Sequence, residues 1–142
     1  MNSSTMGLVD QLAEIVGVDA VKTDSVDLNH FGKDWTKVCV PDPTAIVFPS
    51  NIEQVQDIVK LAHESEVALV PSGGRTGLSG GAVAEKQELV VSFDRMNKIL
   101  SFDALDRQVV CQPGVITEQL QQFATDKELF YPVDFASSGS SQ

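Results

Sequence analysis

The stretch that decides the fold is Pro71-Ser72-Gly73-Gly74-Arg75-Thr76-Gly77-Leu78-Ser79-Gly80-Gly81, in which five of eleven residues are glycine. We call residues 71–81 the glycine loop. An apolar run, Val-Ala-Leu-Val at 67–70, leads directly into it and predicts a short buried strand that ends at Pro71. Glycine permits positive φ, so successive N–H groups can point into one concavity and bind phosphate oxygens. Thr76 and Ser79 add hydroxyl donors and Arg75 adds a positive charge. We therefore interpret the loop as a phosphate cradle rather than as a flexible surface loop.

The spacing excludes two common phosphate-binding motifs. No Gly-Lys-Ser/Thr follows, so the loop is not of the Walker type. The glycines at 74, 77 and 80 are spaced G-x-x-G-x-x-G, which differs from the dinucleotide fingerprint. Only seven residues separate Gly81 from the next apolar run at 89–93, too few for a helical crossover. This short gap also argues against Asp94, at the end of that run, as a ribose ligand.

The segments before the loop predict a right-handed βαβ unit. The apolar run 45–48 predicts a strand, and Ser50 with Glu53 resembles a capping box at the start of a helix. One face of that helix is apolar at helical spacing: Ile52, Val55, Ile58, Val59 and Ala62. The unit places the glycine loop at the carboxyl end of its second strand, where α/β proteins usually bind ligands.

The rest of the chain predicts a second type of sheet. The run 89–93 is a third strand, and 99–103 with 109–112 form a hairpin around a polar turn. Thr117 is a candidate cap for a following helix. Near the N-terminus, Leu8, Leu12, Ile15 and Val16 predict an amphipathic helix that stops at Gly17. We expect residues 1–6 to be disordered and 18–37 to be irregular.

These elements predict an α+β fold in two parts. Residues 1–37 form an N-terminal helix and extension. Residues 38–142 form a domain with a βαβ unit and a small parallel sheet, followed by the start of a mainly antiparallel α+β subdomain.

Four stretches identify a family. They are Asp-Trp-Thr at 34–36, the glycine loop, Gln-Pro-Gly-Val at 112–115 and Tyr-Pro-Val-Asp at 131–134. With them, residues 38–142 resemble the FAD-binding domain of the vanillyl-alcohol oxidase / p-cresol methylhydroxylase superfamily. Within it, the chain is most similar to the flavin-linked D-2-hydroxy-acid dehydrogenases, which include D-2-hydroxyglutarate dehydrogenase, D-lactate dehydrogenase and the glycolate oxidase D subunit.

The resemblance implies that FAD is the cofactor and that the glycine loop surrounds its pyrophosphate. It adds five candidate cofactor-binding residues to the loop: Pro113, Gly114, Pro132, Asp134 and Ser138. Some members of the superfamily attach FAD through a histidine of this loop. Arg75 occupies the matching position here, so the resemblance implies non-covalent FAD.

The resemblance also implies that the chain is the N-terminal part of a larger oxidoreductase. That enzyme would oxidise a D-2-hydroxy acid to the 2-oxo acid with hydride transfer to FAD. We assign no catalytic residue and no metal ligand, because in the family these come from a downstream domain, and we expect residues 1–142 alone to be inactive. Two alternatives stay open: a related flavoenzyme acting on another alcohol or sugar, and a non-catalytic module that binds an anion or a partner.

Composition limits the partners. The net charge of −10, from 20 acidic and 10 basic residues, argues against nucleic acid and anionic membranes. Cys39 and Cys111 lie in apolar contexts and are expected to be small buried hydrophobes. The sequence has neither a signal-peptide pattern nor an apolar run of membrane-spanning length, so we expect a cytoplasmic protein. Unpaired strand edges would favour self-association of residues 1–142 alone.

Overall fold

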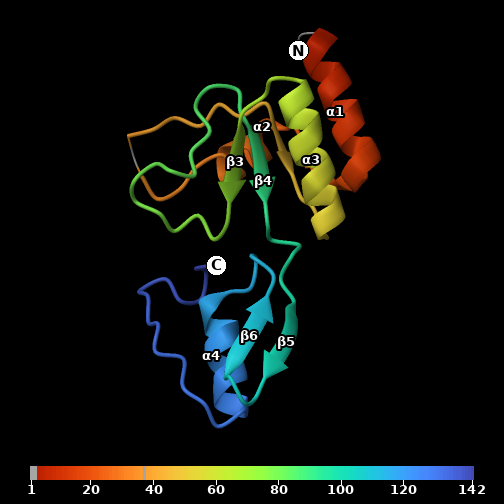
Figure 1. Cartoon of the computed structure of the whole chain (residues 1–142). Helices are drawn as coiled ribbons and strands as arrows, with labels where there is room; N and C mark the ends of the chain where they lie inside the picture. The colour runs from red at the N-terminus through yellow and green to blue at the C-terminus, as the bar shows by residue number, and fades with distance from the viewer. Residues whose placement is uncertain (1–2, 37) are drawn as a thin grey trace.

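The computed structural model describes residues 3–36 and 38–142, which form two lobes joined by a single extended segment (Figure 1). The first lobe, residues 3–93, contains a four-stranded sheet. The second, residues 94–142, contains a two-stranded sheet and one helix. This arrangement confirms the predicted α+β class, with a small parallel sheet followed by an antiparallel one.

The sheet of the first lobe has the strand order β1-β2-β4-β3. The strands are β1 (Val21–Lys22), β2 (Ala45–Val47), β3 (Leu69–Ser72) and β4 (Leu89–Ser92). β4 pairs in parallel with both β2 and β3, while β1 is antiparallel to β2. Because β4 lies between β2 and β3, the carboxyl ends of β3 and β4 are neighbours, and the glycine loop begins beside the residues that follow β4.

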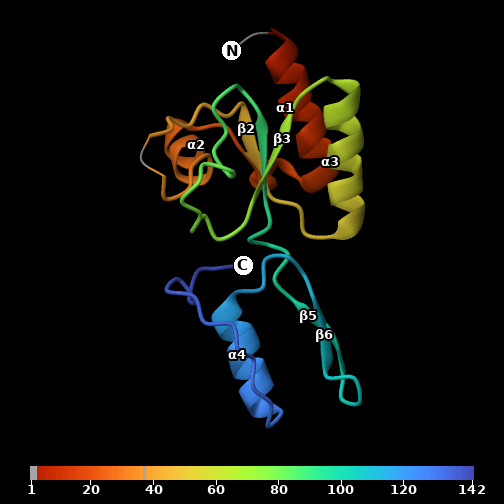
Figure 2. The same cartoon turned by 60° about the vertical axis from the view of Figure 1, so that its left-hand side comes forward.

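Helices cover both faces of this sheet, which explains why its strands are continuously apolar. Helices α1 (Ser3–Val16) and α3 (Ile52–Glu64) lie on one face, and α2 (Ser25–Phe31) lies on the other (Figure 2). Alternate residues of each strand point to opposite faces. Thus Ala45 and Leu89 pack with Leu12 and Ile58, whereas Ile46 and Val90 pack on the α2 side.

The helix α3 begins one residue later than its sequence pattern predicts. Asn51, not Ser50, is its N-cap and accepts a hydrogen bond from the N–H of Gln54 at 2.8 Å. The Gln54 side chain reaches back to the N–H of Ser50 at 2.8 Å, so Gln54 takes the role predicted for Glu53. Ile58 and Ala62 are buried as expected, but Ile52 and Val59 are exposed.

The first lobe contains three elements that the sequence pattern did not predict. A short 3₁₀ helix (Val18–Ala20), β1 and α2 lie in the region expected to be irregular. Asp24 caps α2 by accepting N–H groups from Val26 and Asp27. The expectation of disorder over residues 1–6 is wrong for residues 3–6, which begin α1, whereas Met1 and Asn2 lie outside the described residues.

Strand β3 continues through Pro71 to Ser72, which corrects the prediction that the strand ends at Pro71. An interior strand is hydrogen-bonded to a neighbour on each side, and proline has no N–H to donate to either one. Proline is tolerated in β3 because β3 is an edge strand of the sheet. Its pairing with β4 extends to Ser72↔Ser92. The glycine loop therefore starts with two residues in regular strand geometry.

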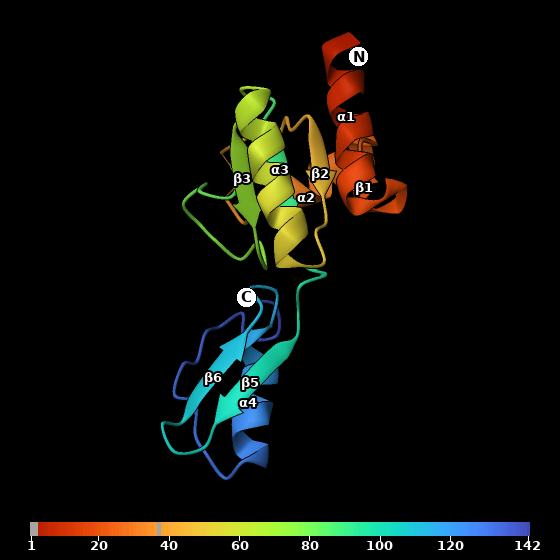
Figure 3. The same cartoon turned by 45° about the vertical axis from the view of Figure 1, so that its right-hand side comes forward.

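The second lobe is a hairpin packed on one helix (Figure 3). Strands β5 (Ile99–Asp103) and β6 (Gln108–Cys111) are antiparallel, as predicted, and α4 (Thr117–Asp126) lies against them. Phe102 and Phe123 meet edge to face at 5.6 Å between ring centroids. Ile116 precedes α4 as its N-cap, so the prediction that Thr117 is the cap is wrong.

The division of the chain at residues 37 and 38 stays a prediction, and Lys37 lies outside the described residues. Leu8 and Leu12 of α1 pack in the same core as Ala45 and Val47. None of the helices in the described ranges combines the length and hydropathy that a membrane span needs.

Candidate cofactor-binding site

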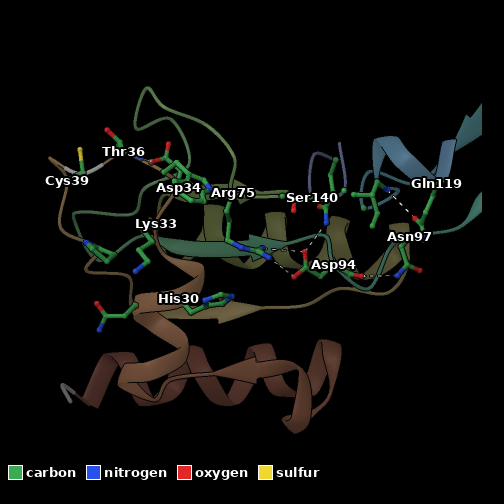
Figure 4. A pocket seen from close by; sticks show the side chains of 18 of the residues that line it. His30, Lys33, Asp34, Thr36, Cys39, Arg75, Asp94, Asn97, Gln119 and Ser140 are labelled. Atoms are coloured by element: carbon green, nitrogen blue, oxygen red, sulfur yellow. Dashed lines mark hydrogen bonds and ion pairs between the residues drawn. The ribbon is translucent and has the colours of Figure 1, made fainter. Parts of the chain in front are cut away.

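A cavity of about 940 Å³ is lined by residues of both lobes. This volume is near the upper end of the roughly 300–1,000 Å³ typical of ligand pockets. Five segments line the cavity: α2 and the chain after it, the glycine loop, the segment after β4, the start of α4, and the C-terminal residues (Figure 4). The lining residues whose side chains bear charge or donor groups are Asn29, His30, Lys33, Asp34, Trp35, Thr36, Cys39, Arg75, Asp94, Asn97, Gln119, Ser140 and Gln142.

An ion pair between Arg75 and Asp94 lies in the middle of this cavity (Figure 4). The Nη2 of Arg75 is 3.2 Å from Oδ2 of Asp94, and the two side chains are 20% and 30% exposed. Arg75 also donates to the carbonyl of Gly73 at 2.9 Å, and its guanidinium lies 4.8 Å from the centroid of the Phe31 ring. The guanidinium is therefore held within the protein rather than pointing to solvent.

The backbone of the glycine loop leaves its N–H groups available. Within the described residues, no acceptor is found for the N–H of any residue from Gly73 to Ser79. Arg75 adopts φ 58, the left-handed conformation that tends to turn neighbouring amides into one concavity. Backbone amides without an acceptor can bind anionic oxygens. The interpretation of the loop as a phosphate cradle stays a prediction.

Some glycines of the loop lie against other parts of the chain, and others face open space. A β-carbon at Gly74 would meet the carbonyl group of Ser140, and at Gly77 it would lie 3.3 Å from Oδ2 of Asp34. At Gly81 it would meet nothing within 4 Å. The lack of a side chain at Gly74 thus accommodates the C-terminal backbone, because the two segments face each other across the end of the sheet.

Gly114 also lies close to backbone atoms of another segment. A β-carbon there would meet the carbonyl oxygen of Phe93, and that of Met96 at 2.8 Å. The N–H of Gly114 donates to the same Met96 carbonyl at 2.7 Å. Gly114 lines the cavity. Its lack of a side chain is required because Gly114 lies against the backbone of Phe93 and Met96, between the two lobes.

The cavity carries both signs of charge. Asp34 and Asp94 are acidic, and Lys33 and Arg75 are basic. Arg75 is paired with Asp94. Lys33 has no ion-pair partner among the described residues.

Cys39 also lines the cavity, and it is half-buried rather than fully buried. The neighbouring Glu85 carboxylate, together with burial, raises the pKa of the Cys39 thiol above its ordinary 9.0. The thiol is therefore a weak nucleophile at neutral pH. Cys111 is exposed, so neither cysteine is the buried hydrophobe predicted from the sequence.

Two hydroxyl groups at the end of the sheet lack a hydrogen-bond partner among the residues that the structure describes. Ser72 and Ser92 are fully buried neighbours in β3 and β4, and neither Oγ atom has a hydrogen-bond partner within the described residues. They follow Val70 and Val90 by two residues and therefore share the α2 side of the sheet. Buried polar atoms are normally hydrogen-bonded, so this pair is unusual, but neither serine is among the residues that line the cavity.

The predicted site residues are only partly brought together. Gly74, Arg75 and Gly114 line the cavity, as do Gly139, Ser140 and Gln142 beside the predicted Ser138. The Ser138 carbonyl instead accepts the N–H of Glu118 at 3.1 Å and so caps α4. Pro113, Pro132 and Asp134 are exposed and lie outside the lining. Ser138 and nine of the eleven residues of the glycine loop also lie outside it: Pro71, Ser72, Gly73, Thr76, Gly77, Leu78, Ser79, Gly80 and Gly81.

The sequence pattern missed the contribution of α2 and of Asp94. Residues 18–37 lack a clear hydrophobic period, so His30 and Lys33 had no predicted position. Asp94 had a usable signal, because it directly follows a strand that neighbours the one before the glycine loop. Among the described residues, no group of three or more His, Cys, Asp and Glu side chains could hold a metal ion.

Comparison with known proteins gives consistent results. The profile of the FAD binding domain family matches residues 43–142. The chain is 64% identical over 135 residues to D-2-hydroxyglutarate dehydrogenase of Stutzerimonas stutzeri, covering 95% of this chain and 29% of that protein. It is 49% identical to the protein of the same name from Xanthomonas citri, covering 91% of this chain and 27% of the relative. The chain thus spans less than a third of either relative.

Solved structures share the fold. p-Cresol methylhydroxylase with bound substrate superposes with a TM-score of 0.84 at 22% identity, covering 99% of this chain and 28% of that one. Alkyldihydroxyacetonephosphate synthase gives a TM-score of 0.85 at 22% identity, covering 96% and 27%.

Proposed function

Since the chain belongs to the FAD binding domain family, we propose that the cavity between its lobes receives FAD and that the glycine loop binds the pyrophosphate. The observation that carries the proposal is the run of N–H groups from Gly73 to Ser79, for which the described part of the chain provides no acceptor. A pyrophosphate offers several anionic oxygens, and backbone amides bind them without the cost of ordering long side chains.

The positive charge for the pyrophosphate is proposed to come from Lys33 more than from Arg75. Lys33 lines the cavity and has no ion pair within the described residues. Arg75 neutralises Asp94, which would otherwise repel a phosphate from the same space. Thr76 and Ser79 stay proposed hydroxyl donors, and Pro113, Gly114, Pro132, Asp134 and Ser138 stay proposed contacts along the rest of the cofactor.

We further propose that the FAD is bound non-covalently. A guanidinium stays protonated in proteins and is a poor nucleophile, so Arg75 cannot form the bond that histidine forms elsewhere in the superfamily. Cys39 has a raised thiol pKa, which disfavours the thiolate needed for attachment through sulfur.

For the whole protein, we propose oxidation of a D-2-hydroxy acid to the 2-oxo acid. Bound FAD would accept a hydride from the α-carbon of the substrate. The residues of this chain would bind and orient the cofactor, and we assign none of them a part in the bond-breaking step. The proposal is supported by 64% identity with D-2-hydroxyglutarate dehydrogenase of Stutzerimonas stutzeri over 95% of the chain.

The experiment is to purify the intact protein that contains this chain and measure flavin per polypeptide from visible absorbance. D-2-hydroxyglutarate and D-lactate are then offered with a dye as electron acceptor. We expect close to one FAD per chain and dye reduction with at least one of the two acids. Purified protein that neither contains FAD nor takes it up from solution would refute the proposed site. Flavin-loaded protein that oxidises neither acid would refute the proposed substrate class.

A further inference from the structure

A buried carboxylate outside the glycine loop holds part of that loop in place. Asp34 follows α2 and is only 8% exposed. Its Oδ2 accepts a hydrogen bond from the N–H of Gly80 at 3.1 Å, and its Oδ1 accepts the N–H of Thr36 at 2.7 Å. Hydrogen bonds from amides to a carboxylate are among the stronger ones in proteins. One carboxylate therefore connects a turn after α2 to a loop more than forty residues away.

The neighbouring backbone makes a second connection to the same part of the loop. The N–H of Trp35 donates to the carbonyl of Gly77 at 2.9 Å. Oδ2 of Asp34 lies 3.3 Å from the position that a β-carbon of Gly77 would occupy, so the loop passes close over the carboxylate. Figure 4 shows Asp34 directly beneath the loop, at the same end of the cavity as Thr36 and Cys39.

The loop has few other restraints. Its amides from Gly73 to Ser79 have no acceptor within the described residues, and its other side-chain ties within the described residues run through Arg75, which pairs with Asp94 and lies over the Phe31 ring. A loop that must present free N–H groups to a ligand cannot use them to stabilise itself. Its conformation has to be set by contacts at its ends, and Asp34 provides the contact at the Gly80 end.

The cost of the negative charge supports a positional role. A carboxylate near a pyrophosphate is unfavourable unless its charge is already balanced. Both oxygens of Asp34 already accept backbone N–H groups, one from the turn after α2 and one from the loop. The carboxylate is thus bound to the loop rather than aimed at a ligand.

We propose that Asp34 is a positioning residue that sets the conformation of the glycine loop for pyrophosphate binding. This proposal rests on the proposed function, because it assumes that FAD is the ligand of the loop. The rival interpretation is that Asp34 only stabilises the local turn through Thr36. The two interpretations differ in whether loss of the carboxylate changes the conformation of the loop at Gly77 and Gly80.

The test uses the intact protein with Asp34→Ala, Asp34→Asn and a matched control, Asp24→Ala. Asp24 is also an aspartate that accepts two backbone N–H groups, at 3.1 and 3.0 Å, but it caps α2 and does not contact the loop. Two quantities are measured: the Kd for FAD added to the apoprotein, and amide hydrogen exchange of the peptide 76–82 in the apoprotein.

We expect Asp34→Ala to raise the Kd by about tenfold or more and to accelerate exchange of the Gly80 amide. Asp24→Ala should leave both quantities near the wild-type values even if it lowers the Tm by a similar amount. Asp34→Asn keeps one oxygen acceptor and should fall between Asp34→Ala and wild type. It decides the question if Asp34→Ala does not fold.

The proposal is overturned if the Asp34 variants bind FAD within about twofold of wild type and exchange the loop amides at the wild-type rate. It is also overturned if Asp24→Ala has the same effects as Asp34→Ala. If the wild-type protein binds no FAD, the proposed function fails, and with it the cofactor role of Asp34. In that case, faster amide hydrogen exchange of the loop in the Asp34 variants would show only that Asp34 stabilises the loop.

Discussion

Substitution of Gly74 by alanine tests how the glycine loop and the C-terminal segment share the end of the sheet. A β-carbon at Gly74 would meet the carbonyl oxygen of Ser140, its carbonyl carbon at 2.8 Å and the Cα of Ser141 at 3.2 Å. All three are backbone atoms, which cannot turn away as a side chain does. The substitution must therefore push the loop and residues 140–141 apart.

The expected magnitude follows from two opposing effects. Adding a methyl group to a well-packed contact costs typically about 1–3 kcal/mol. Replacing glycine by alanine also reduces the freedom of the unfolded chain, which returns about 0.4–1 kcal/mol. The net loss at Gly74 is thus about 1–2 kcal/mol. Where the displacement disturbs the cofactor site, a loss of this size in binding free energy corresponds to a Kd for FAD that is higher by roughly five- to thirty-fold.

Gly81→Ala is the matched control. It changes a glycine of the same loop where a β-carbon would meet nothing within 4 Å, and its φ lies outside the left-handed region. We expect its Tm and its affinity for FAD to equal or slightly exceed those of wild type. Gly74→Val places a branched side chain in the same contact and should abolish FAD binding.

The assay combines thermal unfolding of the apoprotein with a fluorescence titration of FAD, both on the intact protein. The reasoning is refuted if Gly74→Ala and Gly81→Ala give the same Tm and the same Kd. A lower Tm for Gly74→Ala with an unchanged Kd would show that the contact between the loop and residues 140–141 stabilises the fold but does not affect FAD binding.

Three further predictions follow from the site. Because Arg75 replaces histidine, acid precipitation of the holoprotein should release all flavin to the supernatant, and flavin fluorescence on a denaturing gel would contradict this. Gly114→Ala should lower the Tm of the apoprotein, since its β-carbon would meet two backbone carbonyls and cost about 1–3 kcal/mol, and an unchanged Tm would show that the segment between the lobes can shift freely. Iodoacetamide should label the exposed Cys111 before Cys39. Because the pKa of the Cys39 thiol is raised above 9.0, the labelling rate of Cys39 should still increase as the pH passes 9.0, and a rate that levels off below this pH would contradict the shift.

The sequence by itself determined the strands and the donors of the loop. Continuous apolar runs at 45–48 and 89–93 are typical of strands covered on both faces, and the structure contains β2 and β4 there. The hairpin of β5 and β6 was also predictable from its polar turn. The glycines of the loop indicated free backbone amides, since this property depends on local conformation.

Short elements with weak patterns could not be predicted in the same way. Helix α2 has only seven residues, and none of them is fully buried, so no periodicity marks it. Strand β1 has two residues and exists because it pairs with the edge of β2. Strand β3 passes through Pro71 because the strand order leaves it at an edge. Each of these depends on a neighbour that is distant in sequence.

Only the tertiary structure decided what the site residues contact. The order β2-β4-β3 brings Asp94 beside the glycine loop, where it binds Arg75, and the turn after α2 brings Asp34 to Gly80. The chain after α4 returns to the same place, so that Gly74 faces Ser140 instead of open solvent. The physical reason is that residue type and spacing determine which groups a loop can offer, whereas the strand order and the return of the chain determine which of those groups are already used by the protein.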